Sequence, residues 1–164
     1  ALCDEVDGFV KGANYNCPGQ IVVSGDTAAL DALKAIGAER KIKMIPLASS
    51  APFHSERMEP AARVLEKEFE AITFEVPQVP VVMNVDAAVE SDPTAIKQKL
   101  VRQAMAPVLW EKTLLTMQEM GVDTFVEVGP GKTLSGFVKK TCKGASIHRV
   151  ENQATLEETL AALA

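Results

Sequence analysis

The residue type best suited to chemistry in this sequence is a histidine, His54, which follows a run of small residues and a proline. Residues 40–47 have the apolar pattern of a strand and residues 56–65 that of a helix start, so we expect His54 at a strand-to-helix junction. A histidine there could act as a general base, because its unperturbed pKa of about 6.5 allows proton exchange near neutrality. Position alone nevertheless favours a capping or hydrogen-bonding histidine.

Two asparagines form a second candidate group. Asn14 and Asn16 bracket an aromatic residue in the polar stretch 12–20. If this stretch is extended, the two amides share one face, because alternate residues of a strand point the same way. Amides can fix a polar substrate, but asparagine is also common in turns, and the residues alone favour a turn.

The Gly-Pro-Gly-Lys sequence at 129–132 is a weaker candidate, for anion binding. It does not match the phosphate loop, which needs G-x-x-x-x-G-K followed by Ser or Thr. A turn at a helix N-terminus still offers free backbone N–H groups to an anion. A tight strand-to-helix connection is the better explanation.

The sequence supplies no obvious partner for His54. It contains no G-x-S-x-G nucleophile motif, and no cysteine lies in a recognisably reactive setting. Asp86 and Glu127 lie at the ends of predicted strands, but nothing pairs either of them with His54, so structural roles are favoured. The residues therefore give a candidate base without a nucleophile.

The elements predicted for residues 1–50 follow the order α-β-β-α-β. Apolar spacing and glycines indicate a helix tail closed by Gly8, strands at 9–10 and 21–25, a helix capped by Asp26 or Thr27 and closed by Gly37, and a strand at 40–47. This is the order of a ferredoxin-like unit that lacks its first strand. We therefore expect the chain to begin inside a domain.

Residues 51–164 alternate helices with apolar strands, with the boundary between the two parts near 48–53. The predicted elements are a helix over 56–72, a fully buried strand at 79–85, a helix opened by Asp92 and Pro93, a helix over 110–120, a strand at 124–128, a helix after 132, a strand at 146–150, and a last helix with a Thr155–Glu158 capping box. Such alternation is typical of an α/β domain with a mostly parallel sheet.

The charge, apolar runs and cysteines of the sequence exclude several kinds of binding partner. A net charge of −5 argues against a nucleic-acid binder, and no apolar run is long enough to cross a bilayer. Three cysteines without C-x-x-C spacing suggest neither disulfides nor a zinc site, so a reducing compartment, the cytoplasm, is expected. No metal is indicated.

Taken together, five segments resemble the bacterial malonyl-CoA:acyl carrier protein transacylases of type II fatty acid synthesis. These segments are residues 14–25, 51–55, 80–86, 100–103 and 125–132. The resemblance covers the C-terminal portion of that family. It implies an α/β hydrolase-like body over 51–164, with an inserted ferredoxin-like subdomain, partial here, over 1–50.

The resemblance also implies an activity: a serine takes malonyl from coenzyme A and passes it to the phosphopantetheine thiol of acyl carrier protein. His54 matches the family's catalytic histidine, and Gln103 matches the glutamine whose backbone carbonyl orients it. Phe53 matches a bulky residue that selects malonyl over methylmalonyl, and Asn14 and Asn16 match asparagines near the acyl pocket. No cofactor is implied, because coenzyme A enters as the substrate's thiol.

The resemblance further implies what this chain does not contain. The family's nucleophilic serine, its oxyanion-hole glutamine and its malonate-binding arginine match no residue here, so we expect the N-terminal half of the same polypeptide as a partner. Without that half the chain should be inactive and expose apolar surface. Six basic residues could steer an acidic carrier protein: Arg40, Lys41, Lys43, Lys139, Lys140 and Lys143. The alternative function is a non-catalytic module that docks a carrier protein.

Overall fold

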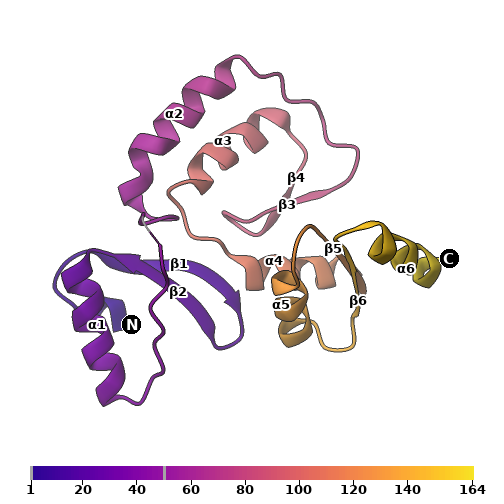
Figure 1. Ribbon diagram of the computed structural model, residues 1–164. Helices are drawn as coiled ribbons and strands as arrows, with labels where there is room; N and C mark the ends of the chain where they lie inside the picture. Colours follow the sequence, from indigo (N-terminus) through magenta and orange to yellow (C-terminus); the bar gives the residue numbers. More distant parts are fainter. Residues whose placement is uncertain (1, 50) are drawn as a thin grey trace.

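The computed structural model describes residues 2–49 and 51–164 and shows a mixed α/β protein (Figure 1). In chain order, the helices and strands are β1 (Val10–Cys17), β2 (Gln20–Gly25), α1 (Thr27–Glu39), α2 (Glu59–Glu70), β3 (Val81–Met83), β4 (Ala88–Glu90), α3 (Pro93–Gln103), α4 (Trp110–Glu119), β5 (Thr124–Val128), α5 (Thr133–Thr141), β6 (Ser146–Val150) and α6 (Gln153–Leu163). Short 3₁₀ helices occupy Leu2–Glu5 and Glu56–Met58.

The N-terminal part is an antiparallel β1–β2 hairpin with α1 packed beside it. Val10, Ala29 and Leu33 form its buried core. The predicted turn over 12–20 is wrong, because β1 runs through Asn14 and Asn16 and only residues 18–19 form the turn. Pairing with the β-branched residues of β2 outweighs the turn preference of asparagine.

Residues 40–47 do not form the predicted strand, and residues 42–49 carry no strand or helix. The alternation of Ile42 and Met44 with lysines is strand-like, but a strand needs a hydrogen-bonded neighbour, and neither β1 nor β2 pairs with this segment. The helix α1 continues past Gly37, where the end of the flexible Met44 side chain packs so closely that a Cβ would lie 2.7 Å from its Cε.

The middle of the chain carries α2, the β3–β4 hairpin and α3. The 79–85 segment was expected as a buried strand of a parallel sheet, and this is wrong: β3 is three residues long and pairs antiparallel with β4. The prediction for α3 is confirmed, because the Asp92 side chain accepts hydrogen bonds from the backbone N–H groups of Thr94 and Ala95 at the start of the helix.

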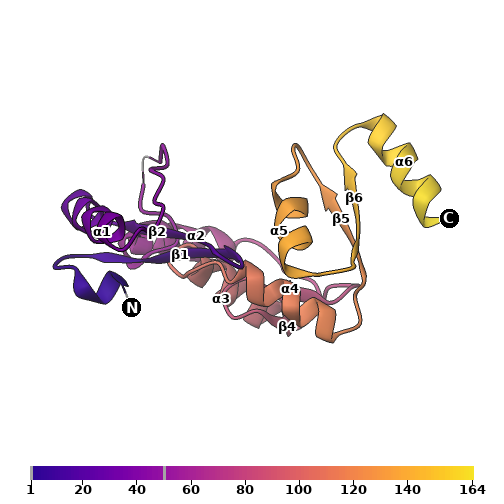
Figure 2. The ribbon, with the colours of Figure 1, turned by 90° about the horizontal axis from the view of Figure 1, so that it is seen from below.

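The C-terminal part contains the parallel pair expected from the sequence. β5 and β6 have the predicted bounds and pair in parallel, joined by α5. Leu114, Val138 and Cys142 form the core between α4 and α5. In Figure 2 this part rises above α4, to the right of the β1–β2 hairpin, and Lys140 of α5 donates a 3.4 Å hydrogen bond to Gln20 of β2. The last helix, α6, has a capping box made by Asn152 and Thr155 rather than by Thr155 and Glu158.

The predicted α/β class is therefore confirmed, although only β5 and β6 form a parallel pair among the described strands. None of the helices in the described part of the chain has the length and apolarity needed to cross a membrane.

Candidate active site

His54 lies in a tight turn that leads into helical structure. Its φ angle is +58°, in the left-handed region that histidine adopts more often than most residues. The 3₁₀ helix Glu56–Met58 and then α2 follow at once. The helical half of the predicted strand-to-helix junction is thus confirmed, whereas the strand half is wrong because residues 42–49 are irregular.

The ring of His54 contacts the end of another helix. Its Nδ1 atom lies 3.0 Å from the backbone oxygen of Gln103, the last residue of α3. Carbonyls in the last turn of a helix have no partner within the helix, so this oxygen is free to accept a hydrogen bond from outside. A proton held on Nδ1 by this bond leaves Nε2 as the basic nitrogen.

The segment that follows Gln103 connects the site to the rest of the fold. The side-chain Nε2 of Gln103 donates to the carbonyls of Ala106 and Pro107, at 3.1 and 3.3 Å. Val108 then exchanges backbone hydrogen bonds of 2.9 Å with β1, donating to Ala13 and accepting from Tyr15. Residues 103–108 therefore join the His54 contact to the strand that carries the predicted asparagines.

Of the other predicted site residues, Asn14 and Asn16 lie on β1 and Phe53 lies in the turn that carries His54. Asn14 forms a parallel bridge with Val108, and both Asn14 and Asn16 are half-buried on β1. Two irregularities interrupt the register of β1, and Asn16 falls in the second, so simple alternation does not place both amides on one face. Phe53, directly before His54, is 52% exposed.

Two ion pairs fasten the His54 turn to the N-terminal part. Lys11 Nζ lies 2.6 Å from Glu56 Oε1, and Arg57 donates to Asp26 Oδ2 at 2.9 Å. The Arg57 guanidinium also stacks 4.7 Å from the centre of the Phe9 ring. These contacts hold the start of the helical region against β1 and α1.

The helix that presents Gln103 is fixed by a second charge cluster. Lys99 Nζ lies 2.8 Å from Asp86 Oδ2 and 3.0 Å from Glu90 Oε2, so α3 is tied to the β3–β4 hairpin. Hydrogen bonds from the backbone N–H of Asp92, then from Lys99 and Ser91, lower the pKa of Glu90 to about 2. Burial opposes ionisation of Asp86, but the bonds from Lys99 and from the Ala88 N–H outweigh it and lower its pKa.

Neither carboxylate considered as a partner of His54 contacts it. Asp86 bonds Lys99, and Glu127 accepts hydrogen bonds from the backbone of Leu134 and Ser135 at the start of α5. Burial works against ionisation of Glu127, but these bonds and that from the Ser135 hydroxyl lower its pKa overall. Glu127 therefore accepts hydrogen bonds from the free N–H groups at the N-terminus of α5 and stabilises this end of the helix.

The glycine turn at 129–132 is also satisfied within the chain. The N–H of Gly131 donates to Glu151 Oε1 at 3.2 Å, and its carbonyl accepts from Arg149. The Glu151 carboxylate thus already accepts the hydrogen bond that the Gly131 N–H group would otherwise offer to a bound anion. As predicted, the turn connects β5 to α5.

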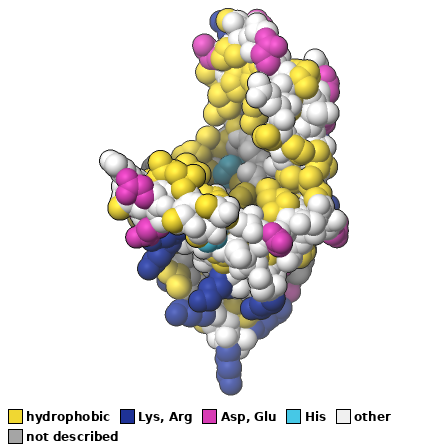
Figure 3. All heavy atoms as spheres, turned by 90° about the vertical axis from the view of Figure 1, so that its right-hand side faces the viewer, with side chains coloured by type: hydrophobic (Ala, Val, Ile, Leu, Met, Phe, Trp, Pro, Cys, Tyr) yellow, Lys and Arg dark blue, Asp and Glu magenta, His cyan; other side chains and the backbone are white. Residues whose placement is uncertain are grey.

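The surface of the described residues exposes many apolar side chains. Figure 3 shows one hollowed face, with hydrophobic side chains around it and histidine atoms visible within it. Large apolar side chains are exposed on several elements, including Val128 of β5 at 77% and Leu160 of α6 at 59%. The apolar exposure expected from the sequence is therefore present.

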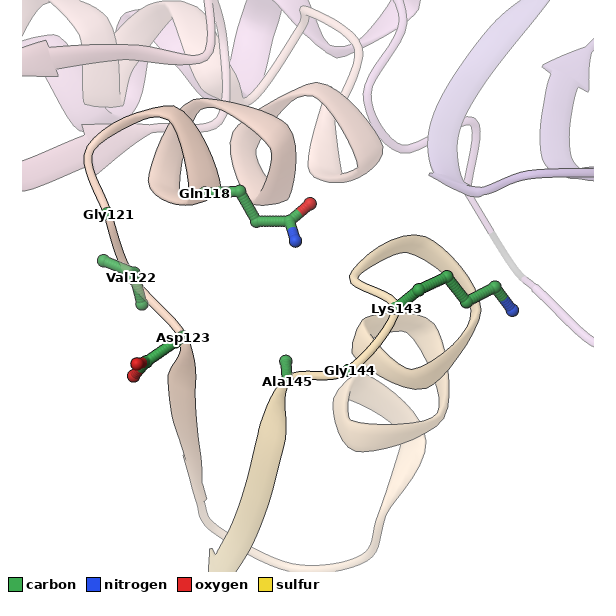
Figure 4. Close-up of a pocket in the computed structure, with 7 residues that line it drawn as sticks. All are labelled: Gln118, Gly121, Val122, Asp123, Lys143, Gly144 and Ala145. Atoms are coloured by element: carbon green, nitrogen blue, oxygen red, sulfur yellow. The ribbon is translucent and has the colours of Figure 1, made fainter.

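A separate pocket of about 290 Å³ lies where α4 and α5 lead into β5 and β6 (Figure 4). It contains none of the predicted site residues, and its lining consists of Gln118, Gly121, Val122, Asp123, Lys143, Gly144 and Ala145. No metal-binding cluster of three or more His, Cys, Asp or Glu side chains occurs within residues 2–49 and 51–164.

Comparison with known proteins places the chain in a family. Residues 4–159 match the model of the acyl transferase domain. The chain belongs to the acyl transferase domain family. It is 41% identical over 154 residues to the malonyl CoA-acyl carrier protein transacylase of Bacillus subtilis strain 168, covering 93% of this chain and 49% of that protein. The Salmonella typhimurium transacylase is also 41% identical, over 155 residues, covering 92% of this chain and 49% of that protein.

Solved structures agree with this assignment of the acyl transferase domain. The Clostridium perfringens malonyl CoA-acyl carrier protein transacylase superposes with a TM-score of 0.94 at 41% identity, covering 99% of this chain and 52% of that one. A malonyl-transacylase solved in complex with a type II PKS acyl-carrier protein gives a TM-score of 0.92 at 37% identity, covering 98% of this chain and 53% of that one. The resemblance inferred from the sequence is confirmed, and the chain spans about half the length of the curated relatives it matches.

Sequence analysis assigned no role to two residues that the structure places near the site of this acyl transferase domain. Ser55 is a buried hydroxyl that closes the His54 turn, and Lys99 anchors α3. A lysine with helical spacing looks like a solvated surface residue, and a serine before a helix looks like an N-cap. The sequence signals for Ser55 were its position directly after His54 and its place in the matched segment 51–55, whereas Lys99 had none.

Proposed function

We propose that this chain supplies the general base for transfer of malonyl from coenzyme A to the phosphopantetheine thiol of acyl carrier protein. The observation that carries the proposal is the 3.0 Å contact between His54 Nδ1 and the Gln103 carbonyl, because it leaves Nε2 free to take a proton. The names of the relatives supply the reaction class.

In the proposed reaction, a serine from sequence outside this chain attacks the malonyl thioester. His54 Nε2 takes the serine proton as the oxygen–carbon bond forms, and the carbon–sulfur bond then breaks. The proton on Nε2 passes to the sulfur of coenzyme A, which leaves as the thiol. The carrier thiol then gives its proton to Nε2, its sulfur attacks the malonyl ester, and the serine recovers the proton.

A neutral carbonyl is a sufficient orienting group for this chemistry. It fixes the Nδ1–H tautomer of His54 but stabilises the imidazolium less than an aspartate would. The weaker stabilisation of the imidazolium is tolerable because a thiolate is a good leaving group and depends less on proton donation from the ring. The Gln103 side chain acts on the loop 104–107 rather than on His54 itself.

We assign the substrate contacts to Phe53, Asn14 and Asn16. Phe53 directly precedes His54 in the chain. Its ring would crowd a methyl group on the α-carbon of the acyl chain, which favours malonyl over methylmalonyl. Asn14 and Asn16, on β1, would contact the polar substrate. The proposed reaction requires no cofactor.

The proposed partner is an acidic carrier protein, and the charge pattern supports it. Lys139 and Lys140 are exposed on α5. Such side chains speed docking of an acidic partner by long-range attraction. One solved relative is in complex with an acyl-carrier protein.

We also propose that the chain divides into two parts, as the family resemblance implies. Residues 51–164 would form part of an α/β hydrolase-like body, and residues 1–50 part of a ferredoxin-like subdomain. The core of Val10, Ala29 and Leu33, separate from that of Leu114, Val138 and Cys142, supports the division. The N-terminal half of the same polypeptide is the proposed source of the serine, and the cytoplasm is the proposed location.

Intact mass spectrometry of the protein purified from its source tests this proposal. After incubation with malonyl-CoA, some polypeptide in the sample should gain one malonyl group and lose it when holo carrier protein is added. A sample in which no polypeptide gains malonyl, while carrier protein still binds, would support the alternative of a non-catalytic docking module.

A further inference from the structure

The turn that carries His54 is closed by a side chain rather than left to the backbone alone. Ser55 Oγ donates a hydrogen bond of 2.6 Å to the carbonyl of Pro52. Ser55 is only 4% exposed, so this hydroxyl has no ready access to water as an alternative partner. The bond spans the two residues between them, Phe53 and His54.

Ser55 does not play the role that its position suggests. It is the residue before the 3₁₀ helix Glu56–Met58, where serine usually accepts a hydrogen bond from a helix N–H, but its side chain makes no such bond. The hydroxyl points back along the chain instead. Its hydrogen bond therefore acts on the residues that precede the helix, among them His54.

The backbone of His54 needs such support. A φ of +58° is a sparsely populated conformation for a residue with a Cβ, and it persists only when surrounding contacts impose it. This conformation sets the direction of the side chain and so brings Nδ1 to the Gln103 carbonyl. On the other side of the contact, the Gln103 amide ties its own segment to Ala106 and Pro107.

We infer that Ser55 is a positioning residue, whose hydroxyl holds the left-handed turn that aims His54 Nδ1 at the Gln103 carbonyl and so selects the Nδ1–H tautomer. The catalytic meaning of this role rests on the proposed function. The prediction of the Nδ1–H tautomer is independent of the proposed function, because it follows from the contact between His54 and Gln103 alone.

A merely structural serine would behave differently. If the Ser55 hydroxyl only stabilised the fold, removing it would leave the Pro52 carbonyl without its hydrogen bond and lower the stability of the protein. The loss would not change which nitrogen of a histidine elsewhere carries the proton. An unrestrained neutral imidazole samples both tautomers, so the tautomer reports the positioning directly.

The test is nitrogen-15 NMR of the complete enzyme with labelled histidine, at a pH where the rings are neutral. The His54 resonances are assigned by their absence from the spectrum of His54→Gln. The unmodified chain should show His54 with a protonated Nδ1 and an unprotonated Nε2. In Ser55→Ala the two resonances should move toward averaged positions, and Ser55→Thr, which keeps the hydroxyl, should restore them.

Ser49→Ala is the matched control. Ser49 also donates to a nearby backbone carbonyl, that of Ala51 at 3.0 Å, but it is exposed. Its removal should leave the His54 resonances unchanged. If Ser55→Ala does not fold by circular dichroism, Ser55→Cys keeps the volume with a weaker donor and should show the same loss of the Nδ1–H preference.

A folded Ser55→Ala or Ser55→Cys chain that keeps the Nδ1–H tautomer would overturn the inference. In the complete enzyme, the same substitution should lower kcat by roughly 10- to 100-fold with little change in KM. A lost tautomer preference without any change in kcat would leave Ser55 as a positioning residue and overturn the role of His54 as base instead.

Discussion

His54 Nδ1 and the backbone oxygen of Gln103 lie 3.0 Å apart, although 49 residues separate them in the chain. One comes from a left-handed turn and the other from the end of α3. Because the acceptor is a backbone atom, the orientation of the base depends on how two segments are held rather than on the identity of an acidic side chain.

Substitution of Gln103 separates its backbone role from its side-chain role. Gln103→Ala keeps the carbonyl, so malonyl transfer should stay within roughly tenfold of the unmodified enzyme, while stability falls by about 1 kcal/mol through loss of the bonds to Ala106 and Pro107. Transfer assays and thermal unfolding measure the two effects. Gln103→Glu should be less stable still, because its carboxylate faces two carbonyl oxygens; equal stability of both variants would contradict this role.

Phe53 should set the choice of acyl group. Phe53→Ala removes the ring of the residue that precedes His54 in the chain, so the rate with methylmalonyl-CoA relative to malonyl-CoA should rise roughly tenfold or more. Competition between the two thioesters measures the ratio. Leu47→Ala, at another exposed apolar residue in the same part of the chain, should leave it unchanged. No change in the ratio with Phe53→Ala would assign the selection to other residues.

Lys99 should make stability depend on acid pH. The pKa of Glu90 is lowered from 4.5 to about 2, so its contribution to stability is complete above pH 4.5 and is lost as the pH falls toward 2. Lys99→Met removes one cause of the lowered pKa but leaves the bonds from the Asp92 and Ser91 N–H groups. Its free energy of unfolding should therefore be lower near neutrality and fall less steeply with acid.

Denaturant unfolding at several pH values measures this slope. Lys67→Met, at an exposed lysine of α2, serves as the control and should keep the slope of the unmodified chain. A Lys99→Met variant with an unchanged slope would mean that the ion cluster does not stabilise the attachment of α3.

The α5 lysines should matter for the carrier protein but not for the thioester substrate. Lys139→Ala combined with Lys140→Ala should raise the KM for acyl carrier protein several-fold and weaken its dependence on salt, with little change in the KM for malonyl-CoA. Steady-state kinetics at two salt concentrations test this. The pair Lys67→Ala and Lys112→Ala, on α2 and α4, is the control; an equal effect there would indicate only a general charge effect.

The sequence predicted best the elements whose pattern is local. β5 and β6 were bounded correctly because their apolar runs end at glycine or polar residues, and α3 because Asp92 and Pro93 mark its start. β1 was missed where asparagines imitate a turn, and residues 40–47 were assigned as a strand that has no partner. Pairing decides both cases, and the pattern of a single segment contains no information on its partner.

The site shows the same limit. Residue type and position made His54 a candidate, but its contact with Gln103 joins distant segments, so only the family resemblance suggested that contact. Ser55 was missed because an N-cap serine is the ordinary interpretation of a serine before a helix. The direction of its hydroxyl depends on the turn, which the residue types did not predict.

The most direct measurement of the proposed function is the rate of malonyl transfer from malonyl-CoA to acyl carrier protein by the complete enzyme carrying His54→Ala. Loss of the general base should lower kcat by roughly 100- to 10,000-fold while the variant stays folded. Ser49→Ala should retain the full rate. A folded His54→Ala enzyme that transfers malonyl within tenfold of the unmodified rate would contradict the assignment of His54 as the base.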